Sequence, residues 1–464
     1  MNLTVNLAVD VSRLTAVRPS ERQIRWQALG FTAFLHFGIN TFTNREWGTG
    51  DEDPALYAPA SLDTGQWCAA LRAAGIKACI LTAKHHDGFC LWDTAHTRHG
   101  VMASPAPVDV VAALAESCRR CGLKLGLYLS PWDMHEETYG TGAAYDDFFC
   151  NQLEELTTGY GALYTLWFDG ACGEGPNGKK QVYDWERYYA VIRKNQPEAV
   201  ISVMGPDVRW IGNEAGETRR SEWSVVSARL RDQALIAARS QQADGLPPLS
   251  PMDEDLGSAQ ALAREPALCW YPAEVDVSIR PGWFYHPEEN TKLRTVDDLL
   301  RMYEASAGGN AVLLLNVPPD TDGCIHAADA SRLRALGEVL RERYRDNLCA
   351  GATAHADDGN ALPQVLIDDE TFWQGDGETC AVALAFPSAR TVRRIVLCEQ
   401  IREGQRIAAF EIAAVTGGEE RVLYRGTTVG FRKICEVGAV HADALRISIT
   451  DSREYPTLRF IGVY

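Results

Sequence analysis

Short apolar runs alternate with amphipathic stretches over the first three quarters of the chain. The apolar runs are nearly free of charge, with Lys124 as the exception. Runs of this length and composition are typical of strands that are buried on both faces of a parallel sheet. They predict strands at residues 31–37, 78–83, 123–129, 162–168, 199–203 and 311–317.

The stretches between these runs have helical periodicity, and glycines follow several of them at Gly75, Gly122 and Gly161. Glycine is favoured where a helix ends in a left-handed residue. Repeated alternation of strand and helix predicts a parallel α/β sheet, here an irregular (β/α)8 TIM-like barrel with long loops over 205–279. A doubly wound open sheet is the alternative, although no G-x-G-x-x-G follows the first strand. The predicted helices cover residues 64–74, 108–121, 145–160, 183–195 and 331–345.

The pattern changes after about residue 346. Alternating apolar and polar positions with glycine-rich turns predict an antiparallel β-sandwich, with runs at 392–397, 408–413, 421–424 and 445–449. We therefore expect two domains, a catalytic barrel at 1–345 and a C-terminal β-sandwich at 346–464. The polar stretch 351–360 is expected to mark the boundary.

Charge and cysteine content narrow the function classes. The 45 Lys and Arg against 62 Asp and Glu give a net charge of −17, which disfavours nucleic acid or an anionic membrane as a partner. No apolar run is long enough to span a membrane, and no secretory signal is visible. The 13 cysteines lack framework spacing and predict reduced thiols in a cytoplasmic protein, with the Cys118/Cys121 pair structural.

Polar and aromatic side chains follow the predicted strands at their carboxyl ends, where a barrel carries its active site. Packing of a stable core does not require polar groups at successive strand ends, so we expect an active site at this rim. The groups concerned are His36 after the first strand, His85, His86 and Asp87 after the second, Tyr128, Trp132 and Asp133 around the end of the third, Trp167 and Asp169 around the end of the fourth, and Trp210 and Glu214 beyond the fifth.

Two chemistries can use these residues. A metal set can be drawn from His36, His85, His86, Asp87 and Asp169. The first strand lacks H-x-H, however, and the adjacent His85 and His86 are expected to project to opposite sides of an extended strand. Metal catalysis is therefore disfavoured, and no metal or other cofactor is expected.

Glycoside hydrolysis needs two carboxyl groups on either side of the scissile bond. Asp169 ends a very apolar strand, which suits a nucleophile, although a strand-end Asp also caps loops. The second carboxyl must come from elsewhere on the rim. The loop at 210–217 offers Glu214 and Glu217, with Glu222 behind them, and Gly212 lets its backbone approach a ligand closely.

Several motifs together resemble the α-L-fucosidases of glycoside hydrolase family 29, and the resemblance covers essentially the whole chain. It implies a barrel followed by a β-sandwich, as the residue pattern predicts independently. The motifs are F-L-H-F-G at 34–38, N-R-E-W-G at 44–48, K-H-H-D-G-F at 84–89, S-P-W-D at 130–133, W-F-D-G at 167–170 and L-L-L-N-V at 313–317.

The resemblance implies that Asp169 is the nucleophile of a retaining double displacement. G-N-E-A-G at 212–216 matches the acid/base loop of the branch selective for α-1,3 and α-1,4 fucosides, which assigns Glu214, with Glu217 and Glu222 as lesser candidates. It also implies action on Lewis a, Lewis x and 3-fucosyllactose, with poor action on α-1,2 fucosides and simple aryl fucosides.

The same resemblance implies a set of fucose-binding residues. His36, His85 and His86 are expected at the sugar hydroxyls, and Glu46 and Trp47 match the family's E-W pair. Tyr128 and Trp167 are expected to complete the wall, with Trp283 near the fucose methyl group. Trp132, Trp210 and Trp223 are expected either on the acceptor side or in the core.

Other functions remain open at this point. They are a broad-specificity α-L-fucosidase, a related glycosidase such as a galactosidase, and a sugar-binding protein without hydrolysis. Transfucosylation is an expected side activity. The C-terminal domain resembles coagulation-factor-type sandwich modules, for which packing against the barrel is the favoured role. The expected partner is a fucosylated oligosaccharide, and the sequence does not indicate an oligomeric state.

Overall fold

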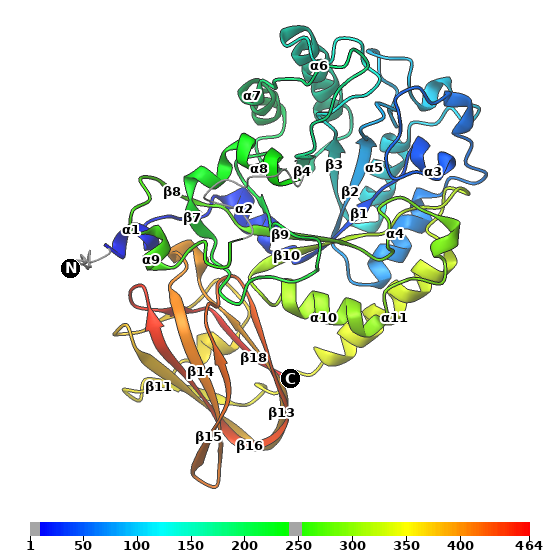
Figure 1. The fold of residues 1–464 in the computed structure, drawn as a ribbon. Helices are drawn as coiled ribbons and strands as arrows, with labels where there is room; N and C mark the ends of the chain where they lie inside the picture. The colour runs from blue at the N-terminus through cyan, green and yellow to red at the C-terminus, as the bar shows by residue number, and fades with distance from the viewer. Residues whose placement is uncertain (1–9, 241–252) are drawn as a thin grey trace, which may run out of the picture.

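Eight parallel strands surround the centre of the larger domain in the computed structural model, which describes residues 10–240 and 253–464 (Figure 1). Their order in the sheet is β5-β4-β3-β2-β1-β10-β9-β6. A parallel bridge between Ser202 and Val208 joins the two ends, so the sheet approaches a closed barrel. The strands are β1 (Phe31–Leu35), β2 (Ala78–Lys84), β3 (Lys124–Leu129), β4 (Leu163–Phe168), β5 (Val200–Val203), β6 (Arg209–Trp210), β9 (Ala273–Ser278) and β10 (Ala311–Asn316).

Helices cover the outside of this sheet. The five predicted stretches match α4, α5, α6, α7 and α11 to within a few residues, whereas α10 was not predicted. Asp63, Asp109 and Asp184 each accept a backbone N–H in the first turn of the helix that follows, which satisfies an otherwise unpaired donor. The main helices are α4 (Thr64–Ala73), α5 (Val110–Cys121), α6 (Ala143–Gly159), α7 (Trp185–Asn195), α10 (Val296–Ser306) and α11 (Ala327–Arg343). Shorter helices are α1 (Ser12–Thr15), α2 (Glu21–Gln27), α3 (Ile39–Thr43), α8 (Gln233–Ser240) and α9 (Ala259–Leu262).

Two barrel strands escape the sequence pattern. β6 has only two residues, and β9 carries Glu274 and Asp276, so neither forms an uncharged apolar run. No helix separates β5 from β6, and the chain between β6 and β9 contains an antiparallel pair, β7 (Val225–Ser227) and β8 (Leu268–Trp270). This irregular part corresponds to the long loops predicted for 205–279.

The C-terminal region is an antiparallel sheet with a small two-stranded sheet beside it (Figure 1). The stretch 351–360, predicted to mark the boundary, contains β11, which already pairs with β13. The strands of this region are β11 (Thr353–Ala356), β12 (Trp373–Gln374), β13 (Cys380–Cys398), β14 (Ile407–Thr416), β15 (Glu419–Gly426), β16 (Lys433–Ser452), β17 (Thr457–Leu458) and β18 (Phe460–Val463).

The two regions meet through buried polar contacts as well as apolar ones. The Arg453 guanidinium lies 3.3 Å from the ring centroid of Trp223, within cation–π range. Gln405 accepts the backbone N–H of Ser224 and donates to the carbonyl of Glu222. These contacts anchor the insertion between β6 and β9 on the C-terminal sheet.

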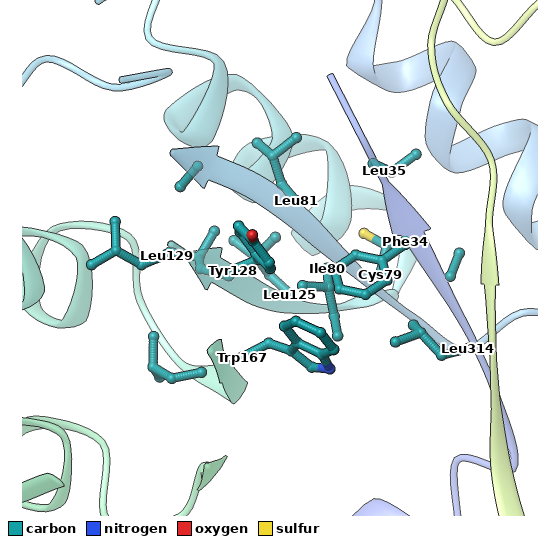
Figure 2. Packing of buried hydrophobic residues seen from close by; sticks show 14 of the residues in the cluster. Phe34, Leu35, Cys79, Ile80, Leu81, Leu125, Tyr128, Leu129, Trp167 and Leu314 are labelled. Carbon is teal, nitrogen blue, oxygen red and sulfur yellow. The ribbon is translucent and has the colours of Figure 1, made fainter. Parts of the chain in front are cut away.

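Aromatic rings from neighbouring strands pack within the core of the barrel (Figure 2). Tyr128 on β3 and Trp167 on β4 stack with ring centroids 5.3 Å apart, and Phe34 on β1 meets Trp167 edge-on at 5.0 Å. Edge-to-face and offset-stacked rings are favourable arrangements.

None of the helices in the described residues is long and apolar enough to cross a membrane.

Candidate active site

A cavity of about 180 Å³ opens at the carboxyl ends of the barrel strands. All ten residues assigned to the site from the sequence line it. The complete lining is Phe34, His36, Glu46, Trp47, His85, His86, Tyr128, Trp167, Asp169, Gly170, Ala171, Val203, Trp210, Glu214, Asp276 and Trp283.

Asp169 follows β4 directly and is held from two sides. Its Oδ1 accepts the backbone N–H of Ala171 at 2.8 Å, and its Oδ2 accepts the Tyr128 hydroxyl at 3.1 Å. The Nε2 of His86 lies 3.8 Å from the same Oδ2. The side chain keeps 26% of its exposure, so the carboxylate is fixed while one face stays open to the cavity.

His36 and His86 have tautomers that their neighbours determine. Asn316 donates its amide to the carbonyl of Trp283, so its Oδ1 accepts from His36 Nδ1 at 2.8 Å. Ser130 donates its hydroxyl to the Trp132 carbonyl, so its oxygen accepts from His86 Nδ1 at 2.7 Å.

Both rings are therefore protonated at Nδ1. Burial lowers the pKa of His36 to about 4 and also lowers the pKa of His86. Both rings are neutral near pH 7, and each keeps Nε2 as an acceptor. Such a nitrogen is suited to a hydroxyl group of a sugar.

His85 lies beside His86, with ring centroids 4.2 Å apart, and both line the cavity. The prediction that the two side chains diverge is wrong, because β2 ends at Lys84 and the chain turns there rather than continuing as a strand. The pKa of His85 lies well below its usual value. Burial is the largest cause, and the charges of the neighbouring His86 and His36 lower the pKa further.

Glu46 and Trp47 come from the loop after β1. The Glu46 carboxylate accepts the backbone N–H groups of Trp283 and Phe284 at 2.9 and 3.1 Å. The Trp47 ring is 56% exposed and stands edge-on against Trp132 with centroids 5.3 Å apart. Trp47 thus offers an apolar face at the mouth of the cavity.

Glu214 reaches the cavity from the exposed loop between β6 and β7. Gly216 has a φ of +81°, and a Cβ there would lie 2.6 Å from Met302, so glycine is required for this loop path. Desolvation raises the pKa of Glu214, the Trp283 indole lowers it by hydrogen bonding, and the charges of Asp169 and Glu46 raise it further. The net shift is upward, which favours the protonated acid.

The two lesser acid/base candidates lie elsewhere. Glu217 is exposed and does not line the cavity. Glu222 is buried between Arg209 and Arg219, with which it forms ion pairs. A buried carboxylate paired in this way holds the fold and has no access to a ligand.

The three tryptophans predicted either on the acceptor side or in the core lie in different places. Trp210 lines the cavity and donates its indole N–H to Asp276 at 2.7 Å. Trp132 lies behind His86 and Trp47, with its indole N–H on the Glu174 carbonyl. Trp223 packs under Arg453 away from the cavity and belongs to the core.

Three residues of the site were missed from the sequence. Phe34 forms an apolar part of the cavity wall, and Asp276 lines the cavity beside Trp210. Glu274 lies behind Trp167 and accepts its indole N–H at 2.8 Å; burial raises the pKa of this carboxyl to about 7. The signal in the sequence was a strand with two carboxyl groups on one face, A-E-V-D-V-S, which an apolar search passes over.

The metal alternative has no geometric support in the described residues. Asp87 accepts the Asn40 amide at 3.0 Å and the Phe89 N–H at 2.7 Å. Within residues 10–240 and 253–464, no group of three or more His, Cys, Asp or Glu side chains is arranged to hold a metal ion. The Sγ atom of Cys118 lies 3.5 Å from that of Cys79 and 3.9 Å from that of Cys68, and the sequence did not predict that these thiols are neighbours.

Comparisons with known proteins agree with this geometry. The family model described as alpha-L-fucosidase matches residues 41–343. Alpha-L-fucosidase 1 of Arabidopsis thaliana is 36% identical over 467 residues, which cover 96% of this chain and 87% of the relative.

Solved structures extend the likeness to the whole fold. A Bacteroides ovatus structure provisionally assigned as an alpha-L-fucosidase is 42% identical with a TM-score of 0.87, covering 98% of this chain and 75% of that one. A glycoside hydrolase family 29 fucosidase of Ruminococcus gnavus in complex with fucose is 28% identical with a TM-score of 0.83, covering 97% and 95%.

Proposed function

The chain belongs to the α-L-fucosidases of glycoside hydrolase family 29, and from this premise we propose that it removes α-1,3- and α-1,4-linked fucose from Lewis-type oligosaccharides with retention of configuration. The observation that carries the proposal is that Asp169 and Glu214 line the same cavity in contrasting environments. One carboxylate is fixed by two donors, and the pKa of the other is raised.

In the first step, ionised Asp169 attacks the anomeric carbon and forms a covalent fucosyl ester. Glu214 gives its proton to the glycosidic oxygen, so the leaving sugar departs as a neutral alcohol. Retaining enzymes hold these two carboxyl groups about 5–5.5 Å apart. The raised pKa of Glu214 supports its role as the acid.

In the second step, Glu214 takes a proton from water, the water oxygen attacks the anomeric carbon, and Asp169 leaves as a carboxylate. A sugar hydroxyl in place of water gives transfucosylation by the same chemistry. Two inversions at one carbon return the original α configuration.

The wall of the cavity supports fucose over galactose. Phe34 is buried next to Trp167 and within 6.4 Å of Trp283, measured between ring centroids. Fucose is a 6-deoxy sugar, so it carries a methyl group at C5 where L-galactose carries a hydroxymethyl group. Against an apolar ring, that hydroxyl loses its hydrogen bonds to water without gaining a partner.

The linkage proposal rests on the acid/base loop and on two aromatic groups that line the same cavity. Trp47 is exposed at the cavity mouth, and Trp210 lines the wall on the Glu214 side. Flat aromatic faces suit the apolar faces of the sugars that remain after fucose leaves. A branched acceptor presents two such sugars.

Release of free fucose from 3-fucosyllactose and from 2′-fucosyllactose under identical conditions tests this proposal. We expect release from the first and little from the second. Comparable release from both would keep the fucosidase and overturn the linkage preference. Release from neither, with α-L-fucosyl fluoride also stable, would overturn the hydrolytic function.

A further inference from the structure

Strand β9 carries two carboxyl groups on one face, and each of them binds the indole of a tryptophan. Glu274 accepts the Trp167 N–H at 2.8 Å, and Asp276 accepts the Trp210 N–H at 2.7 Å. Alternate residues of a strand share a face, and the carboxyl end of a barrel strand lies at the rim. Asp276 is therefore the nearer of the two to the rim, and it lines the cavity, whereas Glu274 does not.

The Asp276 carboxyl uses one of its two oxygens within the protein. Oδ1 accepts the Trp210 indole, and among residues 10–240 and 253–464 no donor contacts Oδ2 and no Lys or Arg pairs with this carboxyl. The side chain is 6% exposed, and that exposure is to the cavity. Glu274 differs, because its second oxygen is buried without a partner. Asp276 Oδ2 is thus a hydrogen-bonding atom that a bound ligand can reach.

Strand β9 holds Trp210 through both its backbone and its side chain. Trp210 lies opposite Glu274 in the parallel pairing, and the N–H of the next residue, Ile211, donates to the Glu274 carbonyl at 2.9 Å. The indole then reaches forward along β9 to Asp276. An indole has a single N–H donor, so this bond sets the direction in which the ring points.

Trp210 also begins the segment that carries the proposed acid. Glu214 follows four residues later, and both side chains line the cavity. The acid must reach the glycosidic oxygen, which joins fucose to the sugar that leaves. This segment therefore faces the bond that is cleaved, and Asp276 belongs to the same part of the wall through its contact with Trp210.

We propose that Asp276 and Trp210 together form the subsite for the sugar that leaves, with the indole against an apolar face of that sugar and Asp276 Oδ2 hydrogen-bonded to one of its hydroxyl groups. This inference rests on the proposed hydrolysis of fucosylated oligosaccharides with Glu214 as the acid. A pyranose has apolar C–H faces and hydroxyl groups around its edge, and an aromatic ring beside a carboxyl group matches both. Asp276 is then a specificity-determining residue, which a substrate without a leaving sugar does not use.

The surroundings of Asp276 also indicate which group donates. Burial raises the pKa of Asp276 well above its usual value, the charge of Glu214 raises it further, and the Trp210 hydrogen bond lowers it by less. In the neutral acid, Oδ1 accepts the indole, so the proton lies on Oδ2 and is donated to a sugar oxygen. Asparagine offers the same arrangement, with a carbonyl oxygen for the indole and an NH2 group for the sugar.

The test compares a substrate that has a leaving sugar with one that has none. We would measure kcat and KM for 3-fucosyllactose and for α-L-fucosyl fluoride in the full chain. The variants are Asp276→Leu, Asp276→Asn, Trp210→Phe and the double variant Asp276→Leu/Trp210→Phe. The matched control is Asp146→Asn, since Asp146 is a buried carboxyl of α6 that accepts the Tyr188 hydroxyl and does not line the cavity.

We expect Asp276→Leu to lower kcat/KM for 3-fucosyllactose by about tenfold to 10²-fold, mainly through a higher KM, and to change kcat/KM for the fluoride by less than about threefold. Asp276→Asn should lose less than about threefold on both substrates. The double variant should lose less than the product of the two single losses, because both changes remove the same hydrogen bond. Asp146→Asn should leave the ratio of the two substrates unchanged.

An equal loss on both substrates in Asp276→Leu would overturn the proposal, since it would place the carboxyl at the fucose or in the fold alone. A loss in kcat with KM unchanged would also overturn it, because it would show that the change displaces the acid. A loss in Asp276→Asn as large as in Asp276→Leu would overturn the role of Oδ2.

Failure of the proposed function gives a different result. If wild type releases fucose from 2′-fucosyllactose and not from 3-fucosyllactose, the linkage preference fails, and the same ratio measured with 2′-fucosyllactose tests the subsite. If wild type hydrolyses neither oligosaccharide and leaves the fluoride intact, the hydrolytic function fails and the subsite falls with it.

Discussion

The two carboxyl groups of the cavity are built in different ways. Asp169 directly follows a buried strand and is held by a backbone N–H and a tyrosine hydroxyl. Glu214 lies on an exposed loop whose path depends on Gly216, and this loop brings it to the cavity that Asp169 also lines. The proposed nucleophile is thus held at the end of a barrel strand, whereas the proposed acid is placed by an exposed loop.

This difference has a mechanistic meaning. A nucleophile must keep its distance to one carbon atom, and a strand end provides that rigidity. An acid/base must serve two steps and admit a leaving sugar and then water, which a loop allows. Changes on the nucleophile side should therefore affect all substrates equally, and changes on the acid side should depend on the leaving group.

The largest effect is expected at Asp169. Asp169→Gly should lower kcat for 3-fucosyllactose by about 10⁴-fold or more, the scale seen when a covalent nucleophile is removed. With α-L-fucosyl fluoride and added azide, the emptied space should allow direct attack and yield β-L-fucosyl azide. Product analysis by NMR checks this, and wild-type protein with azide is the control. Absence of the β azide would count against the nucleophile.

Glu214→Gln should lower kcat/KM for 3-fucosyllactose by about 10²–10⁴-fold, and much less for α-L-fucosyl fluoride. Its raised pKa also predicts that the alkaline limb of the wild-type profile lies above the range of an ordinary glutamate. The limb reflects loss of the proton needed for donation, so it should vanish in the variant. Glu217→Gln is the matched control, and a similar loss there would contradict the assignment.

Glu274 gives a test that concerns stability. Its pKa in the folded protein is about 7 against an ordinary 4.5, so the folded state keeps a proton that the unfolded chain releases. The free energy of unfolding should fall as pH rises from about 4.5 to about 7 and stay level above.

The Glu274→Gln variant has no carboxyl group to titrate here, so it should not lose this free energy of unfolding as pH rises. The amide oxygen of the new side chain can still accept the Trp167 indole N–H. The free energy of unfolding of the variant, minus that of wild type, should increase by about 3 kcal/mol between pH 4.5 and pH 8. Urea unfolding at a series of pH values measures this difference. The exposed Glu217→Gln is the control. Parallel curves for Glu274→Gln and wild type would show that the buried carboxyl does not titrate in this range.

Tyr128→Phe should have the smallest effect of the four. It removes one hydrogen bond to Asp169 while keeping the ring stacked on Trp167. The expected loss in kcat/KM is about tenfold, as for a hydrogen bond to a charged group. The loss should be equal for 3-fucosyllactose and α-L-fucosyl fluoride. A marked difference between the two substrates would contradict the claim that changes near Asp169 do not depend on the leaving group.

The position of the proposed nucleophile was easier to predict from the sequence than that of the proposed acid, for the same physical reason. Strand ends follow from apolar runs, so the sequence alone places Asp169, His36 and His86 on one rim. β9 was missed because Glu274 and Asp276 interrupt its apolar pattern, and their partners are indoles from distant strands.

The hydrogen bond between His286 and Glu46 was missed because it joins loops 240 residues apart in the chain. No local pattern encodes such a contact. Glu214 itself was assigned through resemblance of its loop to a family motif. Its place at the cavity depends on the path of an exposed loop, which only the folded arrangement reveals.

Trapping of the covalent intermediate tests the central claim most directly. Wild-type protein would be incubated with 2-deoxy-2-fluoro-α-L-fucosyl fluoride, whose fluorine at C2 slows both steps while the fluoride still leaves. Peptide mass spectrometry would then locate the label. The account predicts one 2-deoxy-2-fluorofucosyl group on Asp169, with loss of activity in proportion to labelling. A label on Glu214 or elsewhere, or inactivation without any label on Asp169, would contradict it.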